Sequence, residues 1–365
     1  MNDGGPSHGP PISPHTRMAP RLRRGAPRGR LDDLLRPVSR SFYLSLRILP
    51  SGLREPIGLA YLLARAADTV ADTRLLPRAE RLSHLETLRA ACAGSPADVG
   101  ALMRACAAYQ SNDAERRLLE RVDQVIGRLR ALSEADRSAV RSVVETLTSG
   151  MVFDLTRFPG EDAGGLAALD TLEELDHYTY LVAGCVGPFW TALHVAHRPR
   201  LAGWNLAERS TQGVRFGKAL QMTNVLRDAP RDLRAGRCYL PARELASLGL
   251  APHDLLDPAR TRRARPLVLR LIALTLEHYD VAWRYTMAIP RVEWRMRLAC
   301  AWPLSIGLGT LALLARHPDP LGVAEPIKVS RGWVRALIAR SLVTVWSNAA
   351  LGRQSTRLRS AVALG

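Results

Sequence analysis

One apolar run in this chain contains a single narrow stripe of polar side chains. Residues 57–71 are nearly all apolar or small, but polar residues recur at i, i+4, i+7 and i+11: Tyr61, Arg65, Asp68 and Asp72. In an α-helix these positions lie on one face. A solvated helix would spread its polar residues over a broader face. The pattern therefore predicts a buried helix that presents two carboxylates to a cavity. An Arg65–Asp68 pair on an ordinary surface helix is the alternative that this stretch alone leaves open.

A second stripe of the same kind lies within residues 221–241. Amides and carboxylates recur there at i, i+3, i+7 and i+11: Gln221, Asn224, Asp228 and Asp232. Arg227 and Arg237 flank the stripe. Pro230 lies inside it and lacks a backbone N–H, so we expect a helix that kinks just after Asp228.

The two aspartate pairs predict a metal site when they are considered together. Four carboxylates that face one another would repel unless a cation lay between them. Mg²⁺ prefers oxygen ligands and commonly joins carboxylates to substrate phosphates. Arginine binds phosphate through two parallel hydrogen bonds. The spacing thus predicts a helical bundle that holds a metal–diphosphate cluster above an apolar pocket.

The remaining sequence agrees with an all-α fold. Of its 365 residues, 47% are hydrophobic, and the abundant Ala, Leu and Arg favour helix. Neither alternating Val/Ile/Thr runs nor Asn-Gly hairpins indicate strands. We expect a disordered basic tail over residues 1–30, one helical domain over 31–350 and a loose polar tail over 351–365.

The formal net charge of +17 can mark a protein that binds nucleic acid or an anionic membrane. Only Lys218 and Lys328 are lysines, however, and the arginines are scattered rather than clustered. We interpret the charge as a solvated arginine-rich surface, with an anionic partner such as a phosphate ester as the alternative. A nucleic-acid-binding helical protein would show salt-dependent DNA binding and no response to magnesium. We expect no nucleic-acid partner.

Cysteine usage indicates the compartment. Five cysteines are widely spaced and form neither a CxxC motif nor a zinc-ligand pattern with histidine: Cys92, Cys106, Cys185, Cys238 and Cys300. An odd number without a framework favours buried thiols in a reducing compartment. The polar start of the chain lacks the apolar segment of a signal peptide. We expect a cytoplasmic monomer.

Two stretches bear on membrane attachment. Residues 299–315 carry no charge over 17 positions, the lower limit for a membrane span, but they include Pro303 with Gly and Ser. We expect a buried core helix there, with a membrane span as the alternative. Residues 334–346 are interrupted by Arg335 and Arg340 and predict an amphipathic helix. We therefore expect a protein that is soluble or bound peripherally at the inner face of the membrane.

Four segments, taken in order, resemble the squalene and phytoene synthases, the head-to-head prenyltransferases. They are SRSFYLSLRILP at 39–50, YLLARAADTVAD at 61–72, YTYLVAGCVG at 178–187 and QMTNVLRDAPRDLRAGRCYLP at 221–241. The resemblance covers about residues 30–345. It implies the all-α isoprenoid synthase bundle around a central cavity and a magnesium-dependent prenyltransferase of the farnesyl-diphosphate farnesyltransferase type.

The resemblance also implies roles for individual residues. Magnesium would be held by Asp68, Asp72, Asp228 and Asp232, of which Asp68 and Asp228 are expected to be catalytic. Diphosphate would be contacted by Arg40, Ser41, Arg65, Gln221, Asn224, Arg227 and Arg237. The expected active-site tyrosines are Tyr61 and Tyr178. The prenyl tunnel would be lined by Phe42, Val182, Ala183, Val186 and Gly187.

Two positions depart from the family pattern. The motifs often carry a second acid beside the last aspartate, and here Ala71 and Arg231 stand in its place. Arg231 could weaken the negative field at that metal or point outward, and we expect it to point outward.

The family chemistry has two branches. Its members join two prenyl diphosphates into a cyclopropyl diphosphate, which the squalene branch reduces with NADPH and the phytoene branch does not. Residues 325–337 resemble the Val-Lys-Ile-Arg-Lys-Gly segment of squalene synthases, so Lys328 and Arg331 are expected to bind NADPH. A surface cation pair is the alternative. We expect a squalene synthase that uses farnesyl diphosphate. A phytoene, dehydrosqualene or presqualene diphosphate synthase is the alternative, and prenyl chain length is left open.

Overall fold

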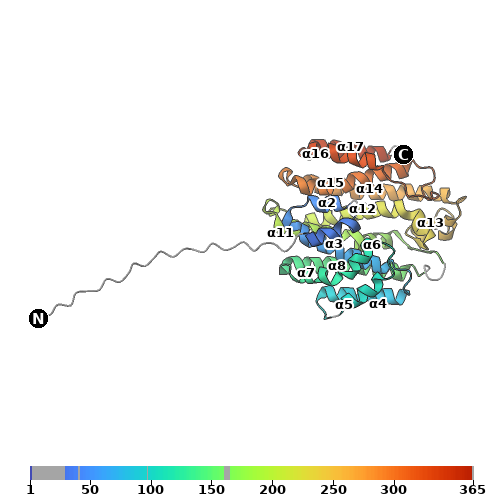
Figure 1. The fold of residues 1–365 in the computed structure, drawn as a ribbon. Helices are drawn as coiled ribbons and strands as arrows, with labels where there is room; N and C mark the ends of the chain where they lie inside the picture. The colour runs from blue at the N-terminus through green and yellow to red at the C-terminus, as the bar shows by residue number, and fades with distance from the viewer. Residues whose placement is uncertain (2–28, 40–41, 97, 160–164, 364–365) are drawn as a thin grey trace.

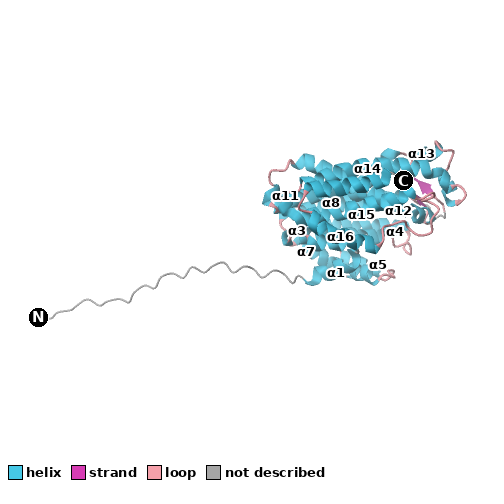
Figure 2. Ribbon diagram, turned by 90° about the horizontal axis from the view of Figure 1, so that it is seen from above, coloured by secondary structure: helices cyan, strands magenta, loops and turns pink. Residues whose placement is uncertain are grey.

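The computed structural model describes the chain apart from residues 2–28, 40–41, 97, 160–164 and 364–365. Within the described residues the chain is a stack of helices (Figure 1), and its strands are only two residues long. The strands β1 (Ala167–Ala168) and β2 (Arg237–Cys238) pair in parallel at one end of the bundle (Figure 2). The all-α prediction is confirmed. The tail expected over residues 1–30 lies almost wholly outside the described residues.

The helices have the following bounds: α1 (Gly29–Ser39), α2 (Phe42–Ile48), α3 (Ser51–Ala71), α4 (Arg78–Ala93), α5 (Val99–Ala107), α6 (Asp113–Glu120), α7 (Val122–Arg130), α8 (Glu134–Arg157), α10 (Leu172–Thr179), the π-helix η1 (Tyr180–Gly184), α11 (Val186–His197), η2 (Pro199–Leu201), α12 (Leu206–Arg234), α13 (Ala242–Ala246), η3 (Pro252–Leu256), η4 (Thr261–Ala264), α14 (Arg265–Ala288), η5 (Arg291–Glu293), α15 (Trp294–Arg316), α16 (Arg331–Thr344) and α17 (Asn348–Ala363). In Figure 1 they form layers, with α16 and α17 outermost on one side and α4 and α5 outermost on the other. Helices α3, α8 and α12 lie between these layers.

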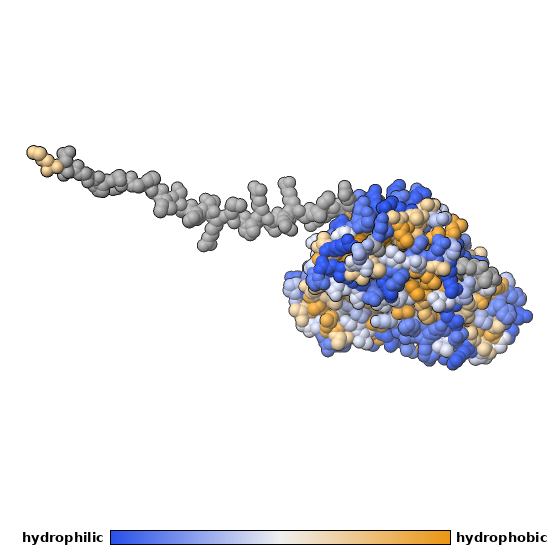
Figure 3. Space-filling model, turned by 90° about the horizontal axis from the view of Figure 1, so that it is seen from below, coloured by the Kyte–Doolittle hydropathy of each residue, from blue (hydrophilic) through white to orange (hydrophobic). Residues whose placement is uncertain are grey.

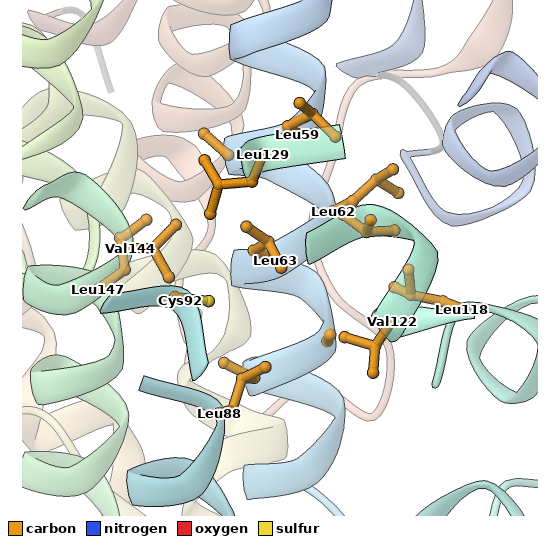
Figure 4. Packing of buried hydrophobic residues seen from close by; sticks show 14 of the residues in the cluster. Leu59, Leu62, Leu63, Leu88, Cys92, Leu118, Val122, Leu129, Val144 and Leu147 are labelled. Carbon is orange, nitrogen blue, oxygen red and sulfur yellow. The ribbon is translucent and has the colours of Figure 1, made fainter. Parts of the chain in front are cut away.

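Helix α3 carries the first polar stripe through the middle of the N-terminal half. Leu59, Leu62 and Leu63 are fully buried. Figure 4 shows them among side chains of the surrounding helices, including Leu88 of α4 and Val144 of α8. Burying each such leucine contributes about 1.5–3 kcal/mol. This packing fixes the rotation of α3 and thereby the direction in which its stripe points.

Helix α12 carries the second stripe and packs against α11 and α14. Gly187 of α11 meets Gly213 of α12 so closely that a Cβ atom on Gly187 would collide with the Gly213 backbone. The two glycines therefore let the helices cross without intervening side chains. Pro230 is buried within α12, and the helix continues past it to Arg234, so the expected kink does not end the helix.

Helix α15 is a core helix of the bundle. Two described stretches, Leu172–His197 and Arg291–Arg316, are long and apolar enough to cross a membrane by length and composition. The second contains α15, and 72% of its apolar window is buried. It packs against α2, α12, α14, α16 and α17. This is the core packing expected for residues 299–315.

The loose polar tail expected over residues 351–365 is wrong for its described part, which belongs to α17. Leu351 and Val362 of this helix are buried against the bundle. Polar contacts also hold the helix: Arg297 donates to Asn348 at 2.5 Å, Gln354 to Ser305 at 2.9 Å and Arg359 to Asp280 at 2.9 Å. Leu358 and Ala361 also pack against the core, so α17 docks through one apolar stripe.

The surface is mixed, and the cysteines lie beneath it. All five cysteines are free and buried, as expected for a reducing compartment. The face seen from below carries hydrophilic residues with hydrophobic ones between them (Figure 3).

Candidate active site

Both aspartate pairs line one cavity of about 520 Å³. Its walls come from α3, α8, α10, η1, α12 and the segment around β2. The residues predicted from the sequence that line it are Arg65, Asp68, Asp72, Tyr178, Val182, Gln221, Asn224, Arg227, Asp228, Asp232 and Arg237. Two stripes more than 150 residues apart in the sequence are therefore brought together, as their spacing predicts.

The first pair lies at the end of α3. Arg65 donates to Asp68 at 2.5 Å and also pairs with Glu115 of α6. The Asp68 side chain is 42% exposed and lines the cavity. Loss of bulk solvent around this carboxylate and repulsion by Asp72 raise the pKa of Asp68 to about 6, against the opposing effect of Arg65.

The second pair lies on α12. Arg227 binds Asp228 through two hydrogen bonds, of 2.9 and 2.6 Å. Burial raises the pKa of Asp232 to about 6, with Asp228 adding to the rise and Arg231 opposing it. In each pair an arginine thus forms hydrogen bonds with the first aspartate, and the second aspartate follows four residues later.

Arg231 does not simply point outward. Its side chain is 65% exposed, but its Nη2 atom lies 3.7 Å from Asp228 Oδ2 and 3.5 Å from Asp232 Oδ1. It also lines the cavity. The expected outward orientation is therefore wrong. Arg231 lies three residues after Asp228 and one before Asp232, so its long side chain reaches both carboxylates while its tip stays in water.

A network joins the first aspartate pair to the far wall. Arg237 donates to Asp154 of α8 at 2.9 Å, and its other terminal nitrogen lies 3.5 Å from Asp72. Tyr239 donates to the second oxygen of Asp154 at 2.6 Å. The rings of Tyr178 and Tyr239 stack with centroids 4.8 Å apart. The pairing of β2 with β1 fixes the backbone that carries Arg237.

Burial sets the protonation of the tyrosines. It raises the pKa of Tyr178 well above the ordinary value, and the charge of Asp154 adds to the rise. Tyr239 is shifted in the same direction, also chiefly by burial. Both phenols are therefore neutral hydrogen-bond donors at physiological pH rather than phenolates.

Apolar side chains also line the cavity. Helix α8 contributes residues that recur at helical spacing: Leu147, Gly150, Met151 and Leu155. Val182 of η1 and Val225 of α12 add to this apolar lining. The π-helix lies where α10 ends, and π-turns of this kind occur frequently at functional sites. The cavity thus combines charged groups with hydrocarbon in its lining.

Several predicted residues lie elsewhere. Tyr61 does not line the cavity, and its hydroxyl donates to Val38 O at 3.2 Å. Gly187 lies at the α11–α12 crossing, and neither Ala183 nor Val186 is among the cavity-lining residues. Arg40, Ser41 and the side chain of Phe42 lie outside the described residues.

The two residues predicted to bind NADPH are exposed and do not line the cavity. Lys328 lies in the segment before α16, and Arg331 is the first residue of that helix. The segment begins near the second acidic pair, since Arg234 donates to Val323 O and Ala324 O at 3.3 and 2.9 Å. Among the described residues, no hydrogen bond or ion pair links either cation to the cavity-lining residues.

The sequence interpretation missed three polar residues beside the cavity. Asp154 and Tyr239 line it, while Glu115 pairs with Arg65. Asp154 could have been predicted from the sequence, because it is a lone carboxylate in the apolar stretch MVFDL. Glu115 could not, since α6 is strongly charged along its length.

The acidic residues fit magnesium as two pairs rather than as one cage. Among the described residues, no group of three or more Asp, Glu, His or Cys side chains is placed to hold a metal ion. Mg²⁺ usually takes one or two carboxylates and completes its shell with water and phosphate oxygens. Burial is the main cause of the raised pKa values of Asp68 and Asp232, and the neighbouring carboxylate adds to each rise, which a bound cation would oppose. Each pair could therefore hold a metal jointly with a diphosphate.

Comparison with known proteins identifies the family. Residues 35–333 match the family described as squalene/phytoene synthase. The chain belongs to this family. Squalene synthase from Schizosaccharomyces pombe is 26% identical over 315 residues, which are 86% of this chain and 65% of that protein. Phytoene synthase from Arthrospira platensis is 27% identical over 289 residues, which are 76% of this chain and 82% of that protein. The chain therefore spans about two thirds of the squalene synthase's length.

Solved structures show the same fold. The complex of TcSQS with a ligand matches with a TM-score of 0.74 and 24% identity, covering 92% of this chain and 90% of that one. The expected isoprenoid synthase bundle of the squalene/phytoene synthase family is thereby confirmed.

Proposed function

We propose that this member of the squalene/phytoene synthase family is a squalene synthase. It would join two farnesyl diphosphates head to head into presqualene diphosphate and convert this to squalene with NADPH. The observation that carries the proposal is the cavity itself, which is lined by two acidic pairs, four arginines and a set of apolar side chains. Squalene synthases among the relatives and the resemblance of residues 325–337 support the choice within the family.

The charged lining of the cavity suits departure of diphosphate. Arg65, Arg227 and Arg237 lie within reach of the aspartates and can each bind phosphate oxygens through a planar fork. Magnesium, when bound by the aspartate pairs, would stabilise the negative charge that develops on the leaving diphosphate. The C–O bond breaks with its electron pair leaving on diphosphate, and an allylic cation remains.

The apolar lining suits survival of that cation. Leu147, Met151 and Leu155 offer no nucleophile and exclude water. The double bond of the second prenyl chain can then attack, and loss of one proton closes the cyclopropane ring. The neutral phenol of Tyr178 faces this space and can orient diphosphate without competing as a nucleophile.

The reductive step would use cations that lie outside the cavity. Lys328 and Arg331 offer two exposed cations for the phosphates of NADPH, whose hydride would quench the rearranged cation. The alternative is a phytoene or dehydrosqualene synthase, or an enzyme that stops at presqualene diphosphate. The similarity to a phytoene synthase, of which the chain covers 82%, supports this alternative.

Product analysis tests the proposal. Purified protein is incubated with magnesium and either farnesyl or geranylgeranyl diphosphate, with and without NADPH, and the extracted products are identified. We expect squalene from farnesyl diphosphate with NADPH and presqualene diphosphate without it. Lys328→Ala should spare the first condensation and raise the apparent KM for NADPH about 10-fold, which corresponds to roughly 1.4 kcal/mol. The same products with and without NADPH would exclude the reductive step.

The proposal includes a cytoplasmic monomer without a nucleic-acid partner. The five buried thiols support a reducing compartment. Size-exclusion chromatography with light scattering would test the monomer, and a DNA-binding titration would test the absence of a nucleic-acid partner.

A further inference from the structure

The outward face of α16 is apolar where a surface helix is normally polar. Leu337 and Ser341 are the buried side of this helix, and Ser341 accepts a hydrogen bond from Trp302 of α15 at 2.7 Å. The side chains turned away are large and apolar, with exposures of 50% for Leu342, 78% for Val343 and 49% for Trp346. Leu342 and Val343 lie in the last turn of α16, and Trp346 lies in the turn that follows it. Helix α16 lies in the outermost layer of the bundle (Figure 1).

The same outward side carries unpaired positive charge. Arg335 and Arg340 are exposed and have no ion-pair partner among the described residues. The sequence from Pro326 to Gly365 contains no Asp or Glu and seven basic residues: Lys328, Arg331, Arg335, Arg340, Arg353, Arg357 and Arg359. Of these, Arg359 is neutralised by Asp280. The apolar face therefore lies in a segment of uncompensated positive charge.

We propose that α16 and the turn after it form a docking surface for an anionic lipid bilayer. This docking face consists of Arg335, Arg340, Leu342, Val343 and Trp346. Helices that lie in a membrane interface combine basic residues with Trp, Leu and other apolar side chains in this way. Anionic lipid headgroups complement the arginines, and each basic residue near such a surface strengthens binding about 5-fold.

The side chain of Trp346 suits a membrane interface. Its indole N–H already donates to Leu342 O at 3.2 Å, so the ring can leave water without losing a hydrogen-bond partner. Its ring also packs against Trp294, with centroids 5.7 Å apart. A nucleic acid would use the arginines alone and would leave the three large apolar side chains in water. A lipid bilayer would thus contact both the arginines and the apolar side chains of the docking face. This proposal does not depend on which reaction the cavity performs.

Vesicle flotation of the full chain tests the docking face. The vesicles contain phosphatidylcholine alone or mixed with phosphatidylglycerol. One variant removes charge, Arg335→Gln with Arg340→Gln, and another removes apolar surface, Leu342→Ser with Val343→Ser. The matched controls are Arg104→Gln with Arg262→Gln, which are exposed arginines of α5 and η4, and Leu256→Ser, a leucine that is 51% exposed.

The expected result is binding of the wild type and controls to the phosphatidylglycerol vesicles and little binding to phosphatidylcholine alone. The arginine variant should bind about 25-fold more weakly, and the apolar variant should also lose binding. The proposal is overturned if the wild type ignores the anionic vesicles. It is also overturned if the apolar variant binds like the wild type, or if a DNA duplex competes the vesicles away.

Discussion

Asp154 of α8 and Arg237 of β2 form an ion pair of 2.9 Å at the wall of the cavity. Both side chains are largely buried, with exposures of 14% and 15%. Because Arg237 also reaches toward Asp72, this pair sets where the guanidinium lies relative to the first acidic pair. We therefore expect Asp154 to act as a positioning residue, distinct from the aspartates expected to hold metal.

Asp154→Asn should keep the shape of this side chain but remove the charge that holds Arg237. A misplaced binding group can lower the rate about 100-fold, so we expect a loss of kcat/KM of that order for farnesyl diphosphate. Circular dichroism should show a retained helical fold. Asp123→Asn, an exposed acid of α7, is the control and should be neutral. Equal activity of the two variants would remove the positioning role.

Arg231 should compete with metal at the second acidic pair. Its guanidinium lies 3.5–3.7 Å from both carboxylates and is exposed, so its removal should tighten magnesium binding about 5-fold, or roughly 1 kcal/mol. Calorimetric titration of Arg231→Gln measures this without turnover. Arg234→Gln is the matched control, because that arginine lies on the same helix but binds two backbone carbonyls. An unchanged affinity in Arg231→Gln would show that the arginine does not neutralise the pair.

The stability of the metal-free protein should depend on Asp232. Its pKa of about 6 lies above the ordinary value for Asp, so the folded state disfavours the ionised form. This cost is fully present above pH 6 and disappears as pH falls through 6 towards 4. Asp232→Asn should therefore raise Tm by about 2 °C or more at pH 8 and by less at pH 5. A differential scanning experiment in chelator measures the difference, and a gain that grows on acidification would have the wrong sign.

Gly187 should be required for packing. A Cβ atom there collides with the Gly213 backbone, so Gly187→Ala should push α11 from α12 and destabilise the protein by about 1–3 kcal/mol. Gly127→Ala in α7 is the control, because nothing lies within 4 Å of its added Cβ. That control should gain up to about 1 kcal/mol from helix propensity. Denaturant unfolding compares the two, and equal midpoints would contradict the close crossing.

The sequence was sufficient for the parts of the site that repeat along one helix. Asp68 with Asp72 and Asp228 with Asp232 each lie on a single face by helical geometry, and their apolar surroundings indicated a cavity. The partners supplied by other elements were not readable. Arg237 reaches its place through a pairing of two-residue strands, which no pattern of so few residues can predict. Tyr239 follows it on the same short segment.

The errors had physical causes as well. Helix α17 looked like a loose tail because its surface is polar, but Leu351 and Val362 bury against the bundle. Arg231 was expected to point outward. The sequence pattern around a single arginine does not determine the direction of its side chain. In both cases tertiary contacts decided what local composition left open.

The two acidic pairs should act together on one diphosphate cluster. Release of inorganic diphosphate from farnesyl diphosphate with magnesium measures this in the wild type, Asp68→Asn and Asp228→Asn. Loss of the charge stabilisation at either pair should lower the rate about 100-fold or more while circular dichroism stays unchanged. Both variants should show this loss, while Asp98→Asn, at the N-terminal cap of α5, should stay near wild type. Near-normal release in either Asp68→Asn or Asp228→Asn would show that the two pairs do not act on the diphosphate together.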